Sequence, residues 1–355
     1  MRSWLEINLK NIEFNLNQIE NLTQKKAIPV IKANAYGLGS IEVAKYLSKK
    51  NFKLFAVANF QEAIEIKNSG LENKILIMGN NDKDDLELAI NNGFSITISS
   101  WDDIKNLEML NTSKEALIHI KIDTGMGRIG FIPDESDKAI KHINDNKLGT
   151  IQGIYSHLSS ADENEDEFTL QQINLFKKYE GMKDIPFIHI LNSPGIFKYS
   201  KYTNTNFVRP GISMYGILLF NTPLQKLLKP VFTLKTKIIY IKTLSINTFI
   251  SYGKTAEGQK GDMIATLPIG YADGLDRRFS NGGKVKIFDK ECKIIGRICM
   301  DMTMIIIPNS LRNKIDVGTE VEIYGKDINK QAESIGSIAD ELMTRINKRV
   351  SRKYI

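Results

Sequence analysis

Residues 27–39 read Ala-Ile-Pro-Val-Ile-Lys-Ala-Asn-Ala-Tyr-Gly-Leu-Gly, and we start from this stretch to predict the fold. A short apolar run ends at Lys32, and a loop with two glycines follows it at once. A buried ammonium group without a partner is unfavourable, so burial here would favour the neutral amine. A neutral lysine amine is the nucleophile that Schiff-base chemistry with an aldehyde cofactor requires. A lysine at a strand end whose amine reaches solvent is the alternative, and this segment alone leaves both open.

The pattern of a short apolar run followed by a helical stretch repeats from residue 27 to about residue 212. Eight runs rich in β-branched residues are predicted to be strands: Ala27–Ile31, Leu54–Ala58, Lys74–Met78, Ser95–Ile98, Ala116–Ile122, Ile151–Ser156, Phe187–Leu191 and Phe207–Val208. Amphipathic stretches between them are predicted to be helices: Ile41–Lys49, Gln61–Asn68, Asp84–Asn91, Trp101–Leu110, Ser136–Asn144 and Phe168–Tyr179. Strict alternation predicts a parallel sheet. Eight units in roughly 200 residues favour a closed (β/α)₈ barrel over an open doubly wound sheet.

The pattern changes after Lys229-Pro230, where glycines separate short β-like runs. The predicted strands are Thr233–Thr243, Met263–Leu267, Lys284–Phe288, Lys293–Ile298, Met302–Ile307 and Glu320–Ile323, and a helical period returns only at Ser334–Asn347. We expect the residues around Trp4 and Ile7 to add a strand to this part of the chain. The predicted fold class is therefore α/β, with a TIM-type barrel over residues 8–228. A mostly β C-terminal domain is predicted to contain residues 229–355 together with residues 1–7.

Composition narrows the class of protein. The 355 residues are 42% hydrophobic and 25% charged, which is typical of a globular chain rather than a disordered one. The N-terminal residues lack the apolar core of a signal peptide, and no stretch is long enough for a membrane span. The two cysteines, Cys292 and Cys299, fit neither a disulfide framework nor a zinc site, so we predict a cytoplasmic protein without a structural metal.

The net charge of +7 does not by itself indicate nucleic-acid binding. The lysines are scattered, and no basic patch is interleaved with aromatic residues that stack on bases. The densest basic cluster, Asn347–Lys353, is interpreted as a solvated tail or the face of a helix. We therefore expect a small-molecule substrate and neither a nucleic-acid nor a membrane partner.

Polar residues follow five of the predicted barrel strands, and the chemistry of such barrels lies at those strand ends. The segments are Lys32, Lys121–Arg128, Tyr155-Ser156-His157, Asn192–Gly195 and Arg209-Pro210-Gly211. Phosphate sites in these barrels commonly form after strands 7 and 8, where Ser193, Gly211 and Ile212 offer a hydroxyl and backbone amides. A Schiff-base lysine, a phosphate site and basic residues on one rim together indicate pyridoxal phosphate (PLP).

At this point the chain is similar to a known family through several motifs in the same order. They are Val30-Ile31-Lys32-Ala33-Asn34-Ala35-Tyr36-Gly37, Asp123–Gly130, Ser156-His157-Leu158, Asn192-Ser193, Arg209-Pro210-Gly211-Ile212, Gly270-Tyr271-Ala272-Asp273-Gly274 and Gly296-Arg297-Ile298-Cys299-Met300-Asp301. These motifs span nearly the whole chain, and they resemble the alanine racemase family, PLP enzymes of fold type III. Each motif alone would be weak, but the set is specific.

The resemblance implies a two-base mechanism. Lys32 would carry the cofactor and act as one base, and Tyr271 would be the base on the opposite face of the substrate. A phenol is a poor base at neutral pH, so a hydrogen bond from His157, polarised by Arg209, would assist it. Arg209 would also donate to the cofactor ring nitrogen while keeping its own proton, which favours racemisation over transamination.

The resemblance also implies roles for further residues. The phosphate would be held by Tyr36, Ser193, Gly211 and Ile212. Arg128 would bind the substrate carboxylate, with Met300 also at the substrate. Lys121, which carries a carbamate in many family members, and Asp301 would support them. Asp340 falls, by our count, where the family usually has a phosphate-binding tyrosine, and we expect its carboxylate to turn away from the phosphate.

The resemblance further implies a homodimer with shared active sites that interconverts L-alanine and D-alanine and supplies D-alanine for peptidoglycan. Three alternatives stay open: a broad-specificity amino-acid racemase, a fold-type III amino-acid decarboxylase and a non-enzymatic PLP carrier. The Gly-Tyr-Ala-Asp-Gly motif argues against the decarboxylase, and the second domain argues against the carrier.

Overall fold

The computed structural model describes residues 2–52, 54–164 and 166–355, and the chain divides into two compact units. The barrel unit comprises Asn11–Ala35 and Gly39–Lys229. The β-rich unit comprises the residues up to Lys10, Tyr36–Leu38 and Pro230–Ile355. Within the described residues, every helix is too short or too polar to cross a lipid bilayer.

Eight parallel strands form the sheet of the barrel unit, in the order β2-β9-β8-β7-β6-β5-β4-β3. Their bounds are β2 (Lys26–Ala27), β3 (Leu54–Val57), β4 (Lys74–Ile77), β5 (Ser95–Ile98), β6 (Leu117–Lys121), β7 (Thr150–Tyr155), β8 (Phe187–His189) and β9 (Phe207–Val208). The segment after β2 closes the sheet, because Ile28 donates to the carbonyl of Val208 while Ile31 donates to that of Ala56. The predicted barrel is confirmed, and each predicted strand overlaps an observed one.

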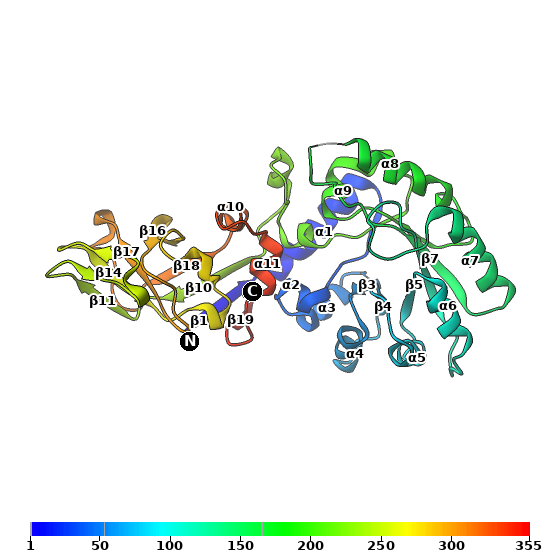
Figure 1. Cartoon of the computed structure of the whole chain (residues 1–355), viewed down its shortest axis with the longest axis horizontal. Coiled ribbons are helices and arrows are strands. Elements are labelled where there is room, and N and C mark those ends of the chain that lie inside the picture. Colours follow the sequence, from blue (N-terminus) through cyan, green and yellow to red (C-terminus); the bar gives the residue numbers. More distant parts are fainter. Residues whose placement is uncertain (1, 53, 165) are drawn as a thin grey trace. The chain divides into compact units, whose positions relative to one another are not determined.

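Helices alternate with these strands and cover the outside of the barrel (Figure 1). Their bounds are α1 (Leu9–Thr23), α3 (Ser40–Ser48), α4 (Phe60–Asn68), α5 (Lys83–Asn91), α6 (Trp101–Glu108), α7 (Pro133–Asp145), α8 (Glu167–Phe176) and α9 (Ser193–Tyr199). The segment labelled α2 (Lys32–Tyr36) is a left-handed turn rather than a covering helix. Short polar side chains start several of them. Asn59 accepts a hydrogen bond from the amide of Glu62 at the start of α4, and Ser100 accepts one from the amide of Asp103 at the start of α6.

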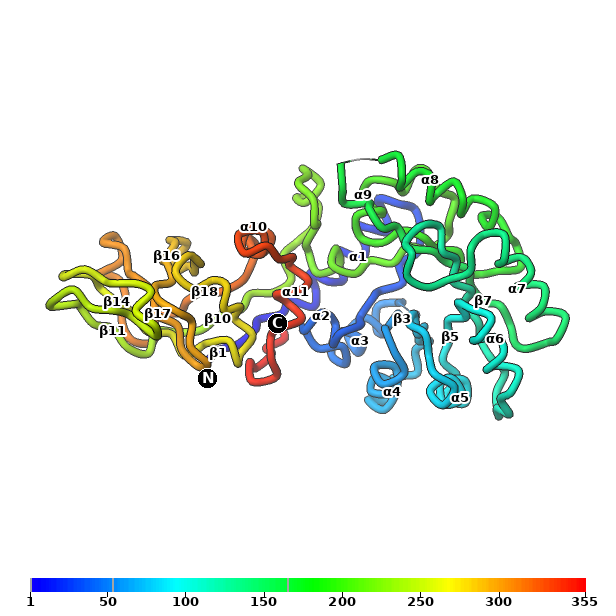
Figure 2. The backbone as a smooth tube through the Cα atoms, viewed as in Figure 1, coloured from blue at the N-terminus to red at the C-terminus, as the bar shows by residue number. Residues whose placement is uncertain are grey.

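The β-rich unit contains a nine-stranded sheet in the order β11-β14-β17-β16-β15-β18-β10-β1-β19. The bounds are β1 (Ser3–Ile7), β10 (Phe232–Lys237), β11 (Tyr240–Thr243), β14 (Met263–Leu267), β15 (Lys284–Ile287), β16 (Lys290–Ile294), β17 (Thr303–Ile307), β18 (Glu320–Tyr324) and β19 (Ser351–Tyr354). A separate hairpin pairs β12 (Thr248–Phe249) with β13 (Glu257–Gly258). The first and last strands run side by side in Figure 2, since β1 pairs with β19 in parallel. The expected N-terminal strand is thus confirmed.

Three predictions for this unit are wrong in detail. The predicted strand Thr233–Thr243 is two strands, because the chain leaves β10 and pairs again elsewhere as β11. The predicted helical stretch Ser334–Asn347 begins only after α10 (Ile328–Glu333) has ended and is helical only over α11 (Ala339–Thr344), because the chain turns between the two helices, where Gly336 has a φ of 65°. The basic tail is partly a strand, because β1 supplies backbone partners for Ser351–Tyr354 that the side-chain pattern does not reveal.

Candidate active site

Lys32 is followed by an unusual left-handed turn. The four residues Ala33–Tyr36 all have φ between 50° and 55°, a region where each non-glycine residue costs roughly 1 kcal/mol or more. The carboxylate of Glu62 stabilises the turn, because it accepts the amide of Ala33 at 2.7 Å and that of Ala58 at 2.8 Å. Strain of this kind persists where surrounding contacts hold the chain, and it often marks functional sites.

A cavity of about 310 Å³ lies in the barrel unit at the carboxyl ends of its strands. It is lined by Lys32, Ala58, Met78, Gly79, Asn80, Lys121, Arg128, Ile129, Tyr155, His157 and Arg209. Five of the predicted site residues, from strands and loops far apart in the sequence, therefore meet at one cavity. Four of the five are basic side chains, two of them arginines, so the cavity suits an anionic ligand.

Arg209 is buried in the barrel and donates hydrogen bonds only to neutral acceptors. Its Nη1 lies 2.6 Å from Nδ1 of His189 and 3.1 Å from the carbonyl oxygen of that residue. Its Nη2 lies 2.6 Å from the carbonyl of Ser156 and 3.2 Å from Nδ1 of His157. Across residues 2–52, 54–164 and 166–355, no carboxylate is bonded to this guanidinium. The positive charge is held in place without being neutralised.

Burial lowers the pKa of Arg209 to about 10, with the charge of Arg128 acting in the same direction. Burial and then Arg209 also hold the pKa of His157 well below its usual value, so this imidazole is neutral at neutral pH. An arginine can only donate, so Nδ1 of His157 accepts and the proton of the ring lies on Nε2. His157 is thereby a hydrogen-bond donor on its second nitrogen.

Lys121 is fully buried, and its Nζ donates to the carbonyl of Ile122 at 2.7 Å. Burial, followed by the charge of Arg209, lowers the pKa of this amine to about 7, although Asp123 acts in the opposite direction. A large fraction of Lys121 is therefore uncharged at neutral pH. The neutral amine is the form that can react with carbon dioxide to give a carbamate and a proton.

The loop that carries Arg128 is shaped by one carboxylate. Oδ1 of Asp123 accepts the backbone amides of Gly125 at 2.9 Å and Met126 at 2.8 Å, and Oδ2 accepts that of Gly127 at 3.0 Å. Burial opposes ionisation of Asp123, but these amides hold its pKa below the usual value. A charged Asp123 keeps the loop tight and so fixes the backbone next to Arg128.

Three of the four predicted phosphate residues, Ser193, Gly211 and Ile212, cluster at the ends of β8 and β9. Oγ of Ser193 accepts the amide of Gly211 at 3.0 Å, the amide of Ser213 at 3.1 Å and the hydroxyl of Ser213 at 3.0 Å. Asn192 caps α9 through the amide of Gly195 at 3.2 Å. Ile212 begins the 3₁₀ helix Ile212–Tyr215 beside them and is buried. The cluster supplies hydroxyls and backbone amides, the donor set that binds phosphate.

The remaining predicted residues belong to the β-rich unit. Tyr271 begins a 3₁₀ turn whose amide donates to the carbonyl of Cys299 at 3.1 Å, and its ring is 43% exposed. The next amide, of Ala272, donates to the carbonyl of Met300 at 3.1 Å. Asp301 follows, and its carboxylate accepts from Arg349 at 2.7 Å. Tyr271, Met300 and Asp301 therefore share one backbone platform.

Tyr252 is a second exposed tyrosine that borders the same platform, and the motif search did not weigh it. Its ring is 70% exposed, and its neighbours Ser251 and Lys254 have φ of 66° and 49°. Oγ of Ser251 donates to the carbonyl of Arg297 at 2.5 Å and lies 3.4 Å from Sγ of Cys299. A strained turn that presents an exposed phenol is a signal that only backbone geometry reveals.

Tyr36 lies in the β-rich unit and is almost fully buried. Burial raises the pKa of its phenol strongly, and the charge of Asp340 adds to the shift. Asp340 is thus close enough to Tyr36 to act on it. The phenol stays protonated at any physiological pH and can donate a hydrogen bond.

The motif search also missed three residues around the barrel site. His119, His189 and Ser213 are all buried, and the first two lie on predicted strands. Two of them are histidines, of which the chain has only four, inside apolar strand runs. That rarity was the available signal, because a histidine among isoleucines in a barrel strand needs a polar partner inside the barrel.

Known proteins match this chain over almost all of its length. Residues 7–218 match the family described as alanine racemase, N-terminal domain, and residues 231–354 match alanine racemase, C-terminal domain. An alanine racemase of Fusobacterium nucleatum subsp. nucleatum is 42% identical over 356 residues, covering 99% of each chain. One from Methanococcus maripaludis is 36% identical over 372 residues, covering 99% of this chain and 98% of the other.

Solved structures agree with these matches. The alanine racemase of Clostridium difficile 630 superposes with a TM-score of 0.91 at 36% identity, covering 100% of this chain and 96% of the other. That of Bacillus anthracis with bound L-Ala-P gives a TM-score of 0.88 at 30% identity, covering 100% and 95%. Both domain matches, the full-length relatives and the shared fold lead to one assignment. The chain belongs to the alanine racemase family.

Proposed function

We propose that this chain interconverts L-alanine and D-alanine with PLP, and that it does so at the barrel cavity. The family is PLP-dependent, and the relatives reported above are named alanine racemases. The observation that carries the proposal is the cavity itself, where Lys32 and a buried, uncompensated Arg209 line the same space. A buried guanidinium without an anion is unfavourable, and an anionic ligand would relieve it.

The donor set of the barrel fits PLP. Lys32 supplies the amine that attaches the aldehyde, and Arg209 supplies a donor for the ring nitrogen. Ser193, Ser213 and the amide of Gly211 suit the phosphate, to which Tyr36 would add a phenolic donor. When bound, PLP withdraws electrons from the α-carbon of an amino acid and makes its α-hydrogen acidic.

Racemisation in both directions then requires a proton acceptor on each face of the α-carbon. We assign Lys32 to one face and a phenol of the β-rich unit to the other. Tyr271 is the candidate from the motif, and the protonated Nε2 of His157 is a suitable donor to its oxygen. Tyr252 is a second candidate, favoured by its strained turn and its greater exposure.

Matched substitutions distinguish the two tyrosines. Tyr271→Phe and Tyr252→Phe each remove one hydroxyl from an exposed ring, so neither should affect folding. Loss of the true base should lower kcat by about 10²–10⁴-fold, with a much smaller effect from the other substitution. The measurement is kcat for each enantiomer, with exchange of the α-hydrogen in D₂O. The variant without the base should exchange one enantiomer far faster than the other. Equal small losses for both would contradict a phenolic base.

Substrate recognition rests on Arg128 and Met300. The guanidinium of Arg128 suits a carboxylate, and Met300 is 53% exposed beside the Tyr271 turn. A neutral or carbamylated Lys121 near Arg128 avoids repulsion between two cations, and Asp301, the neighbour of Met300 in sequence, is held by Arg349. The sequence-based alternative of a broad-specificity racemase differs only in which side chains this region admits.

We further propose that the active form is a cytoplasmic homodimer in which Lys32 of one copy works with a tyrosine of its partner, and that its D-alanine serves peptidoglycan synthesis. Support comes from the distribution of the proposed bases over two separate units of the chain. The two cysteines, Cys292 and Cys299, are free thiols, as is usual in a reducing compartment.

Mixing inactive chains tests the shared site. Homodimers of Lys32→Ala and of the base-less tyrosine variant (Tyr271→Phe or Tyr252→Phe) should both be inactive. A mixed dimer of the two contains one intact site and should recover activity. Mixing Lys32→Ala with Lys32→Arg chains is the control, because no intact site can form. Exchange of subunits is verified with differently tagged chains. Proven exchange without recovery would contradict a shared site.

Chiral analysis tests the reaction itself. Purified protein with PLP is incubated with L-alanine, L-serine and L-lysine separately, and the enantiomers are quantified. Loss of handedness for alanine alone supports the proposed substrate, and loss for several amino acids supports the broad-specificity alternative. Borohydride reduction followed by peptide mapping should place the pyridoxyl group on Lys32. A label on another lysine would contradict the assignment.

A further inference from the structure

Behind Arg209, away from the cavity, two further imidazoles continue the hydrogen-bonded chain into the barrel. Nδ1 of His189 faces Nη1 of Arg209 at 2.6 Å, and Nε2 of His189 lies 3.4 Å from Nδ1 of His119. Both histidines are fully buried. The barrel interior therefore contains a continuous row of three side chains: Arg209, His189 and His119.

Hydrogen-bond chemistry fixes where each proton of this row lies. Arg209 can only donate, so Nδ1 of His189 must accept and its ring proton must lie on Nε2. That Nε2 then donates to Nδ1 of His119, which must accept in turn. His119 consequently carries its own proton on Nε2, and this atom is buried without a hydrogen-bond partner among the residues that the structure describes.

The backbone of β6 and β7 leaves room for the imidazole of His119, the last side chain of this row. The pairing of β6 with β7 shifts register between Ile118 and His119, which is a local irregularity at that residue. Opposite it stands Gly153, where a Cβ atom would lie only 2.2 Å from Nδ1 of His119. Any other residue at position 153 would displace the imidazole, so the local backbone and sequence both accommodate this ring.

The surroundings keep both imidazoles uncharged. Burial, followed by the charge of Arg209, lowers the pKa of His119 to about 3 and holds that of His189 well below its usual value. Lys121 acts on His189 in the same direction, and the aromatic ring of Tyr155 stacks on His189 with the centroids 5.0 Å apart. A protonated His189 would turn its Nδ1 into a donor that opposes Arg209.

We propose that His189 and His119 form a neutral imidazole relay that positions Arg209 as a donor toward the cofactor ring while leaving its charge uncompensated. This inference rests on the proposed function, because the relay acts through Arg209. A carboxylate in the place of His189 would hold the guanidinium equally well but would neutralise it. The relay instead accepts a hydrogen bond from Arg209 at His189 and ends at His119, which is also neutral, so no negative charge faces the guanidinium. His119 is thus a positioning residue that acts on the cofactor site only through His189 and Arg209.

The first test observes the protons directly in the wild-type holoenzyme. The chain has four histidines, so ¹⁵N-histidine labelling gives four rings, with the exposed His142 as the solvent-accessible reference. Assignment uses His119→Asn, His142→Asn and His157→Asn, and His189 is the ring that remains in all three variants. Between about pH 6 and pH 9, His189 and His119 should both show a protonated Nε2 and a bare Nδ1. A proton on Nδ1 of His189 in the holoenzyme would overturn the relay.

The second test removes the acceptor and then restores it. His119→Leu fills similar space but accepts nothing, whereas the amide oxygen of His119→Asn can replace Nδ1. We expect His119→Leu to lower kcat about 10-fold with KM for alanine changed less than about 3-fold, and His119→Asn to recover most of that loss. The Nε2 proton signal of His189 should move upfield in the leucine variant and return in the asparagine variant. Equal losses in both variants would show a purely structural role and overturn the proposal.

The two tests separate the relay from the proposed function. If His119→Leu does not fold, the wild-type proton positions and the asparagine variant still decide the matter. A holoenzyme with the expected protons that leaves alanine unchanged would refute the proposed function and retain the relay. An enzyme that racemises alanine but carries a proton on Nδ1 of His189 would refute the relay and retain the proposed function.

Discussion

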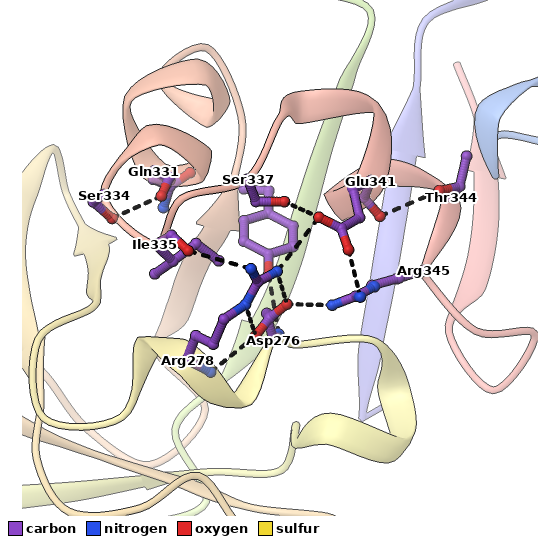
Figure 3. Close-up of polar contacts among 10 residues, drawn as sticks. Asp276, Arg278, Gln331, Ser334, Ile335, Ser337, Glu341, Thr344 and Arg345 are labelled. Carbon is purple, nitrogen blue, oxygen red and sulfur yellow. Dashed lines mark hydrogen bonds and ion pairs between the residues drawn. The ribbon is translucent and has the colours of Figure 1, made fainter.

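Two of the arginine clusters in the described part of the chain are built on opposite principles. In the barrel, Arg209 is buried and bonds only to carbonyl and imidazole groups. In the β-rich unit, Arg278 and Arg345 both bind the carboxylate of Asp276, and both also contact Glu341 (Figure 3). Figure 3 shows these side chains converging from α11 and the Asp276 turn. Compensated arginines join segments of structure, whereas an uncompensated one retains its charge for a ligand.

The same substitution, arginine to glutamine, in each of the two clusters should give the largest difference in kcat. Arg209→Gln removes the charge at the cavity, and we expect kcat to fall by about 10²–10³-fold, as for loss of an electrostatic donor at a reacting group. Arg278→Gln removes an arginine of the compensated cluster, and kcat should stay within about 2-fold because Arg278 is not among the residues assigned to the reaction and Arg345 still binds Asp276. The measurement is kcat with saturating PLP, alongside thermal unfolding. Similar kcat losses in both variants would remove the distinction.

Lys121 is a second buried basic group of the barrel, and it should make the free energy of unfolding depend on pH. Its folded pKa of about 7 lies below that of the unfolded chain, so the folded state binds fewer protons and stability rises between the two values. Lys121→Met should therefore raise the free energy of unfolding most below about pH 7, on the order of 4 kcal/mol, and least near pH 10. Denaturant unfolding at both pH values measures this difference. A gain that does not depend on pH would contradict a neutral buried amine.

Asp276 gives the smallest expected effect. Its side chain is 4% exposed, and the hydrogen bond from Arg278 lowers its pKa. Because the folded pKa is depressed, its contribution is present above the unfolded value and is lost as the pH falls through the folded value. Asp276→Asn should lower the free energy of unfolding by about 2 kcal/mol near pH 7, and the gap should close in acid. A gap that persists in strong acid would show that the loss is not electrostatic.

Sequence patterns predicted the barrel well because its strands are apolar runs with strict alternation. The same reasoning placed Lys32, His157 and Arg209 at strand ends, and these residues line one cavity. It did not predict β19, because the strand depends on backbone partners in β1 rather than on its own side chains. It also merged β10 and β11 of the β-rich unit into a single strand, because pairing over long sequence distances sets their boundaries.

The polar interior of the barrel was the larger gap. His119 and His189 sit in apolar runs, and nothing in a linear pattern shows that two strands bring them within 3.4 Å. The left-handed turn after Lys32 and the strained turn at Tyr252 were equally hidden, since neither uses glycine at every position with positive φ. Local propensity would place other residues there, and tertiary contacts override it.

The close fit between Gly153 and His119 links two positions that lie 34 residues apart. Position 153 is strict, because a larger side chain there would displace the imidazole, whereas position 119 accepts the few side chains that fill similar space. A mutational library that randomises the two sites separately would find position 153 the less tolerant one. Randomising both positions together is the way to find new pairs. Such pairs would replace the polar interior of the barrel with an apolar one. His189 would then lose its acceptor, and each recovered variant would show how this affects Arg209.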